Sequence, residues 1–352
     1  MADPVYVPII KGRQGEFAAL RAIQPATRQN VLPLLEIVPG PADERAAMRQ
    51  VIERTAMKLQ GWAGNRLLLD SGLLVTDVVI TGGLGAVGFA AAVVSDRGVV
   101  VTPVVRLGDP GLAHEDAAAI HTDWAGGVAI RLGPEDLDEE PEDLGAALDA
   151  LLARLRITRG EVDLVLDVGA VDGELGVRAG SRLLGDAIRE LAEIDAWRTI
   201  ISASGAFPAD LSGLQPWTMG EPARYDAALF DHLRQRRRIP RIPTYGDYAV
   251  AHPFLPTGPA FPPAPSLRYT VADKWLTLKG RRNDPRGHDQ FYDICDMVAG
   301  HPEFVGVALG LADARIAASR QEGPGNASTW REIGTTHHLD YVVQRLTTLG
   351  EP

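Results

Sequence analysis

The stretch VDLVLDVGAVDG, Val162 to Gly173, decides the fold, because its run of branched apolar residues ends on an aspartate and then turns. Such an unbroken run is typical of a strand that is buried on both faces. A carboxylate inside a buried strand is costly, so we expect Asp167 at the end of the strand, where it can face a site.

Seven further short apolar runs have the same form, and segments with helical spacing separate them. In ADERAAMRQVIERTAMKLQGW and EDLGAALDALLARLRI, apolar residues recur at i, i+3, i+4 and i+7, which is typical of a helix with one buried face. Apolar strands that alternate with such helices form parallel sheets. The eight runs are VYVPII, VLPLLEI, RLLLD, VVTPVVRL, GVAIRL, VDLVLD, RTIISAS and RIPTYGDY.

Eight strand–helix units between Val5 and about Tyr248 match a closed, TIM-like (β/α)8 barrel. An open doubly wound sheet is the competing fold, but KGRQGEF after the first run lacks the G-x-G-x-x-G turn. We therefore predict a barrel over 1–250 and a Pro-rich connection over 251–267. The remainder, 268–352, is predicted to form a C-terminal α+β extension or lid that packs on or near the barrel mouth.

Composition limits the classes of partner. The 352 residues include 35 Lys plus Arg against 46 Asp plus Glu, a net charge of −11, which disfavours non-specific nucleic-acid binding. Cys295 is the single cysteine, which excludes a disulfide framework within the chain. No apolar run reaches the ~18–20 residues of a membrane span, and MADPVYVPIIKGRQGEF lacks the pattern of a signal peptide. We expect a cytoplasmic protein with no membrane partner.

Polar side chains stand at the ends of all eight predicted strands, and in a barrel these ends form the catalytic face. We expect a polar cup there that holds an anionic, phosphate-bearing molecule. The candidate catalytic acids, or ligands of Mg²⁺ or Mn²⁺, are Glu36, Asp70, Asp167 and Asp247. The candidate ligand-binding residues are Lys11, Arg106, Arg131, Ser202, Ser204 and Tyr245. The alternative is a network in which these acids and bases pair with one another and close the barrel.

Several stretches resemble the phage beta-protein family, a group of phage-related and bacterial proteins. They include YVPIIKGRQGEFAAL, VDLVLDVGAVD, PTYGDYAVAHP, RYTVADKWLTLKGR and GPGNASTWREIGTTHHLDYVV, and their order extends through nearly the whole chain. LGLAD, which ends at Asp313, departs from the aromatic-containing turn of the family. The resemblance implies a role in conflict between phage and host. The matching positions are Lys11, Gln14, Glu36, Asp167, Ser204, Gly246, Asp247, Trp275, Lys279, Arg281, Asn326, Trp330, His337 and His338.

The extension carries polar and aromatic residues that a packing arm does not require, and we expect them to complete the site from above. These further ligand-binding candidates are Lys279, Arg281, Asn326, Trp330 and His337. Two functions stay open. The first is a hydrolase or phosphodiesterase-type enzyme acting on a nucleotide or another phosphate-bearing molecule. The second is a non-catalytic interaction or immunity protein that uses the barrel as a scaffold for a protein partner. Converging carboxylates beside unpaired arginines would favour the enzyme, and aspartates locked to arginines would favour the binding protein.

Overall fold

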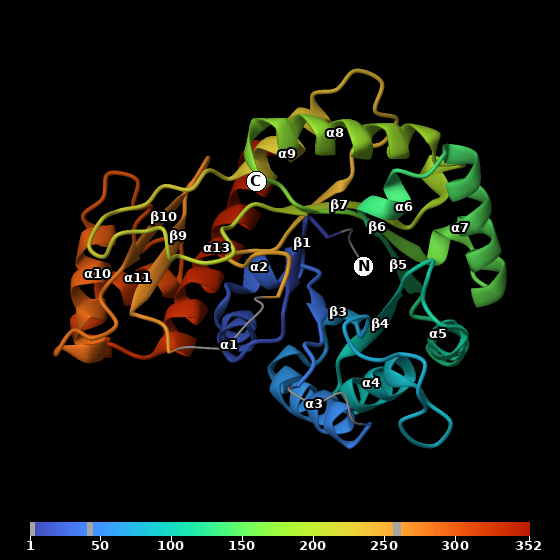
Figure 1. Ribbon diagram of the computed structural model, residues 1–352, viewed down its shortest axis with the longest axis horizontal. Coiled ribbons are helices and arrows are strands. Elements are labelled where there is room, and N and C mark those ends of the chain that lie inside the picture. Colours follow the sequence, from blue (N-terminus) through green and yellow to red (C-terminus); the bar gives the residue numbers. More distant parts are fainter. Residues whose placement is uncertain (1–3, 41–44, 256–261) are drawn as a thin grey trace.

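The computed structural model describes residues 4–40, 45–255 and 262–352, and its centre is a closed barrel of eight parallel strands. β1 pairs with β8 as well as with β2, which closes the sheet. Figure 1 shows the helices around the strands of the barrel. The predicted barrel is therefore confirmed. The strands are β1 (Tyr6–Ile10), β2 (Leu34–Glu36), β3 (Arg66–Asp70), β4 (Val100–Val105), β5 (Val128–Leu132), β6 (Val162–Ala170), β7 (Thr199–Gly205) and β8 (Thr244–Asp247).

Helices between the strands cover the outside of the barrel, as the segments with helical spacing predict. In α8, for example, Val177, Leu184 and Ile188 are buried at intervals of seven and four residues and form one apolar face. These helices are α1 (Gln14–Ala22), α2 (Pro25–Asn30), α3 (Arg45–Lys58), α4 (Ala86–Ser95), α5 (Gly111–Trp124), α6 (Pro134–Leu137), α7 (Pro141–Leu155), α8 (Gly173–Glu190) and α9 (Tyr225–Arg234).

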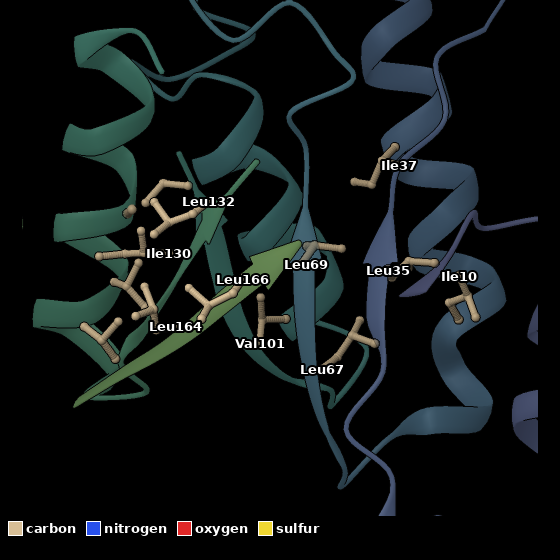
Figure 2. Packing of buried hydrophobic residues seen from close by; sticks show 14 of the residues in the cluster. Ile10, Leu35, Ile37, Leu67, Leu69, Val101, Ile130, Leu132, Leu164 and Leu166 are labelled. Atoms are coloured by element: carbon tan, nitrogen blue, oxygen red, sulfur yellow. The ribbon is translucent and has the colours of Figure 1, made fainter. Parts of the chain in front are cut away.

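Side chains of each strand alternate between two apolar layers, because successive residues of a strand point to opposite faces. One layer fills the barrel and includes Leu34, Leu68, Val104 and Val165. The other lies between strands and helices and is shown in Figure 2. Burial of each such side chain stabilises the fold by about 2 kcal/mol. The labelled members of this outer layer are Ile10, Leu35, Ile37, Leu67, Leu69, Val101, Ile130, Leu132, Leu164 and Leu166.

A charge network closes the amino-terminal end of the barrel. The carboxylate of Asp163 is fully buried and accepts hydrogen bonds from the guanidinium groups of both Arg66 and Arg198. Nε of Arg66 also donates to Oγ1 of Thr102 at 3.1 Å. This end of a barrel serves stability, and the opposite end carries the loops that build sites.

The C-terminal residues form the α+β extension, which has a core of its own. The hairpin of β9 (Ser266–Thr270) and β10 (Trp275–Lys279) packs against α10 (Gln290–Ala299) and α11 (Leu311–Ala317), and α12 (Ser319–Glu322) follows. The extension lies beside the barrel in Figure 1. Backbone bonds of Gly220 with Thr277 join β10 to the loop after β7, so the extension packs near the barrel mouth as predicted.

The last helix, α13 (Ala327–Leu349), belongs to both parts. Trp330 and Ile333 in its first half lie in the core of the extension. Leu339 and Val342 in its second half lie in the barrel core, and the helix packs along α1. The second half of α13 thus takes the place of the helix that follows β8, and the predicted boundary at residue 250 does not separate the two cores. Within the described ranges, none of the helices combines the length and apolar character needed to cross a bilayer.

Candidate functional site

The alternation of strand side chains divides the ten strand-end candidates into two sets. Ile201 and Ala203 of β7 fill the barrel interior, as does Tyr248 directly after β8. Side chains one residue away on these strands must therefore point outward. The inward set is Lys11, Glu36, Asp70, Arg106, Arg131 and Asp167, and with Tyr248 we call it the cup. The outward set is Ser202, Ser204, Tyr245 and Asp247, which corrects the expectation that all ten strand-end residues form the polar cup.

Arg131 lies at the centre of the cup and contacts all three of its carboxylates. Its Nη1 donates to Oε1 of Glu36 at 2.9 Å and to Oδ2 of Asp70 at 2.6 Å. Its Nε and Nη2 donate to Oδ2 of Asp167 at 3.0 and 2.6 Å. The side chain of Arg131 is 7% exposed. Arg131 is thus the single cation shared by acids from β2, β3 and β6.

The remaining two cations of the cup are paired from its sides. Arg106 binds Asp70 with both terminal nitrogens, at 3.0 and 2.7 Å, in a bidentate geometry that adds strength and direction. Nζ of Lys11 lies 2.7 Å from Oε2 of Glu36 and also donates to the carbonyl of Pro253, which belongs to the chain after β8. Arg106 is the most exposed of the three cations, at 29% of its side chain.

Tyr248 completes the cup. Its hydroxyl donates to Oδ2 of Asp167 at 2.6 Å and accepts from Nη2 of Arg131 at 2.7 Å. Burial and the adjacent Asp167 carboxylate raise the pKa of Tyr248 well above its ordinary value, so the phenol stays protonated. Burial raises the pKa of Asp70, but Arg106 and Arg131 outweigh it and hold that pKa well below the ordinary range. Asp70 is therefore held as a carboxylate.

Charge in the cup is balanced. Lys11, Arg106 and Arg131 contribute three positive charges, and the ion pairs match them with the three carboxylates of Glu36, Asp70 and Asp167. The Arg131 guanidinium supplies, among these carboxylates, the positive charge that a divalent cation would supply. In the described part of the chain, no group of three or more His, Cys, Asp or Glu is arranged to hold a metal ion. The expected Mg²⁺ or Mn²⁺ ligands are thus engaged with arginine and lysine.

Two members of the outward set, Tyr245 and Asp247, belong to a second buried network, between the barrel wall and α13. Ser202 and Ser204 are buried beside it, and Oγ of Ser202 has no hydrogen-bond partner among the described residues. Asp247 accepts hydrogen bonds from the hydroxyls of Tyr6 and Tyr245, and one of its oxygens lies 3.0 Å from Nε2 of His338. Nδ1 of His338 lies 2.8 Å from Oγ1 of Thr270 in β9. Asp247 therefore ties the barrel to both the last helix and the extension. It does not reach the mouth.

Two further buried charges share this network. Arg224 lies 3.9 Å from Asp226 and 4.0 Å from Asp247, and its Nη2 donates to the hydroxyl of Tyr245. Burial raises the pKa of Asp247, but His338, Arg224 and the hydrogen bond from Tyr6 together bring that pKa below its ordinary value. Tight burial of every member makes this network a structural connection between barrel and α13.

The five extension candidates lie apart from the cup. His337 is fully buried and lies 3.0 Å from Asp313, and its ring stacks on Tyr269. Lys279 donates to the carbonyl of Leu211 in the loop after β7. Arg281 is exposed, Asn326 caps α13 by accepting from the amide of Ser328, and Trp330 is buried in the core of the extension. Among the described residues, none of these five shares a hydrogen bond or ion pair with the cup.

Tyr248, Tyr6, Arg224 and Asp226 take part in the two networks but are absent from the residues that strand ends alone select. Tyr248 could have been predicted from the alternation of side chains along a strand, because it lies two residues after the inward-facing position Gly246. Arg224 and Asp226 lie at the start of α9, after a long loop, and no strand pattern points to them.

The chain has remote likenesses among known proteins. Among solved structures, the chain is similar to a triosephosphate isomerase from Bartonella henselae, at 10% identity, with 70% of this chain and 92% of that chain covered and a TM-score of 0.36. It is also similar to N-(5'-phosphoribosyl)anthranilate isomerase from Pyrococcus furiosus, at 11% identity, 69% and 86% coverage and a TM-score of 0.33. Likenesses at this level carry no argument about activity. A search of curated protein sequences found no match.

The fold and the site define a (β/α)8-barrel protein whose mouth holds a charge-balanced cup and whose last barrel helix follows an inserted α+β extension. The chain belongs to the Beta protein family, whose model matches residues 6–344. The resemblance seen in the sequence is confirmed by this match.

Proposed function

We propose that the protein is a non-catalytic binding protein that uses its barrel as a scaffold for a protein partner. The observation that carries this proposal is the pairing within the cup, where Arg131 binds Glu36, Asp70 and Asp167 at once. A general acid or base has to exchange a proton with a substrate, and a phosphate site has to offer free donors. Each would require these ion pairs to separate inside a buried site, which costs several kcal/mol.

Apolar side chains on the mouth-face loops support a protein partner. Leu73, Val75 and Val79 are exposed in the loop after β3, and Leu175 follows β6 with 80% of its surface exposed. Phe254, after β8, is 66% exposed and lies close to Gly169 at the end of β6. We call these five residues the rim. Exposed apolar residues gathered on one face are typical of protein-binding surfaces, and the family resemblance supports a partner that belongs to a phage or its host.

A hydrolase is the second candidate, and Arg106 is the observation that favours it. Its guanidinium is partly exposed at the mouth, so an anionic substrate could approach it while Asp70 holds its other side. This function requires turnover that depends on the cup carboxylates.

The test compares partner binding and turnover in matched variants. Tagged protein is recovered from phage-infected cells, bound chains are identified, and each is purified and titrated against the wild type, the rim variant Leu175→Ser with Phe254→Ser, and the far-side control Met57→Ser with Trp124→Ser. We expect one chain to bind the wild type and the control and to lose at least about tenfold in affinity for the rim variant.

Turnover is measured with bis(p-nitrophenyl) phosphate in the presence of Mg²⁺ or Mn²⁺, with Asp167→Asn as the comparison. If the wild type hydrolyses the ester and a folded Asp167→Asn variant does not, the function is that of a hydrolase and the proposed binding function is wrong. Equal affinity of the partner for the rim variant and the wild type would remove the rim as its surface.

A further inference from the structure

Three arginines meet where the extension joins the barrel, and their charges are not balanced. Arg13 precedes α1, Arg268 lies in β9 and Arg331 lies near the start of α13. Among the described residues, the carboxylate that faces them is Glu16, whose Oε1 lies 3.8 Å from Nη1 of Arg331. The other oxygen of Glu16 accepts from the backbone amides of Lys11 and Arg13. The cluster is therefore basic overall, in contrast to the balanced cup.

Arg331 shows the imbalance at the level of a single atom. Its Nη1 is buried and has no hydrogen-bond partner among the described residues. An unsatisfied guanidinium donor costs free energy unless an acceptor is supplied from outside the chain. The amino-terminal end of α13 lies beside Arg331, and its partial positive charge makes the cluster still more attractive to an anion.

Arg268 is held so that part of its guanidinium stays available. One terminal nitrogen donates to the carbonyl of Val250, and the guanidinium lies over the ring of Phe207 with 4.5 Å between its carbon and the ring centre. Burial, Arg331 and Arg13 together lower the pKa of Arg268 to about 9. Arg268 therefore remains charged near neutral pH but is destabilised by its like-charged neighbours.

A cavity of about 110 Å³ opens onto these groups. Arg268, Arg331 and Trp330 line it, together with Ser266, Pro263 and Ala327. Its volume is below the ~300 Å³ at which pockets for drug-sized ligands begin, so it suits a single anionic group. Forked guanidinium donors match the oxygens of phosphate, and the Ser266 hydroxyl adds a neutral donor.

We propose that Arg13, Arg268 and Arg331 form a binding site for a phosphate group at the junction of barrel and extension. The phosphate oxygens accept from Nη1 of Arg331 and from the remaining donors of Arg268, and Arg13, whose charge acts on both of these arginines, adds positive potential. The group is supplied either by inorganic phosphate or by a phosphomonoester whose organic part lies outside the cavity. The site shares no residue with the rim, so its test does not depend on the proposed partner binding.

The test is calorimetric titration of the full chain with inorganic phosphate and, in parallel, with glycerol 3-phosphate. Arg331→Gln is expected to weaken binding at least about tenfold, since a hydrogen bond between charged groups is lost, and Arg13→Gln is expected to weaken it by a smaller factor, since that variant removes positive charge alone. Arg54→Gln, on the exposed face of α3, is the control for loss of one positive charge. Tighter binding of the ester than of phosphate would identify the phosphomonoester as the source, and the reverse would identify the free ion.

Thermal unfolding without phosphate gives a second reading. Because the three arginines repel one another, Arg331→Gln should unfold at a higher temperature than the wild type in chloride and should gain nothing from added phosphate, whereas the wild type should gain stability. The proposal is overturned if the wild type binds neither anion, if Arg54→Gln weakens binding equally, or if Arg106→Gln at the barrel mouth abolishes binding while Arg331→Gln does not.

Discussion

Arg131 and Asp167 are joined by two hydrogen bonds to one carboxylate oxygen, 3.0 Å from Nε and 2.6 Å from Nη2, although 36 residues separate them in the chain. They come from the neighbouring strands β5 and β6. The second terminal nitrogen of Arg131 reaches across the barrel to Glu36 and Asp70. One guanidinium thus links its own strand β5 to β2, β3 and β6 at the barrel mouth, and its removal leaves three buried carboxylates without their shared cation.

The first prediction concerns that removal. Arg131→Met keeps most of the side-chain volume but takes away the shared cation, so we expect the free energy of unfolding to fall by about 3–5 kcal/mol. Arg106→Met, at the exposed side of the cup, should cost less because Asp70 keeps Arg131. Urea unfolding of both variants measures the difference. Equal losses in the two variants would contradict the central role of Arg131.

The second prediction uses the same variant as a metal binder. Without the guanidinium, the carboxylates of Glu36, Asp70 and Asp167 lose their shared cation, and Mn²⁺ or Mg²⁺, which prefer carboxylate oxygen, can neutralise them once the side chains move closer together. Added Mn²⁺ should therefore raise the unfolding temperature of Arg131→Met and leave that of the wild type nearly unchanged. A shift of the same size in both proteins would show that the cation binds elsewhere.

The third prediction is a pH dependence that Asp70 contributes. Arg106 and Arg131 overcome the effect of burial and depress the pKa of Asp70. A carboxyl with a depressed pKa in the folded state adds stability above its unfolded pKa of about 4, and this is lost as pH falls toward the folded value. As the pH falls from about 5 to about 3, the wild type should therefore lose about 1 kcal/mol of folding stability through Asp70.

Asp70→Asn checks this dependence. The variant should be less stable than the wild type at neutral pH, because it releases Arg106, and its stability should fall about 1 kcal/mol less over the same acid interval. Asp77→Asn, which removes an exposed carboxylate from the loop after β3, is the matched control and should follow the wild type. Parallel curves for Asp70→Asn and the wild type would contradict the depressed pKa.

Much of the barrel could be predicted from the sequence because apolar runs such as VDLVLD and amphipathic segments are local signals. The inward orientation of six strand-end residues could also be predicted. The same pattern could not show that Asp167 points inward and Asp247 points outward. That distinction depends on parity: Asp247 alternates with Gly246 and Tyr248, and a one-residue error in the strand reverses the face.

The rest depends on contacts between distant parts of the chain. No local pattern indicates that α13 returns to the barrel after the extension, so the partners of His338 could not be assigned from its neighbours. The arginine cluster is equally non-local. In the sequence, nothing distinguishes Arg13, Arg268 or Arg331 from an ordinary surface arginine. Only the fold brings the three side chains near one another.

The fourth prediction concerns His338, which links barrel, extension and last helix. His338→Ala removes the contacts with Asp247 and Thr270 and leaves the buried Asp247 carboxylate without the ring nitrogen that lies 3.0 Å from it. We expect a loss of about 3 kcal/mol or more. Hydrogen exchange should rise in α13 and β9 before it rises in β3 to β5. His232→Ala, at an exposed position of α9, is the control and should change neither measurement.

The fifth prediction tests the packing of α1 on α13 through Gly15, the second glycine of KGRQGEF. A Cβ at this position would lie 2.5 Å from the carbonyl oxygen of Ser328 and 3.0 Å from the amide nitrogen of Glu332, both in the backbone of α13. Because backbone cannot move aside as a side chain can, Gly15→Ala should lower the free energy of unfolding by about 1–3 kcal/mol. Gly145, inside α7, has open space around its Cβ position, so Gly145→Ala should instead add about 0.5–1 kcal/mol. Urea unfolding of the two variants should give changes of opposite sign, and a gain of stability in Gly15→Ala would mean that α1 and α13 do not pack this closely.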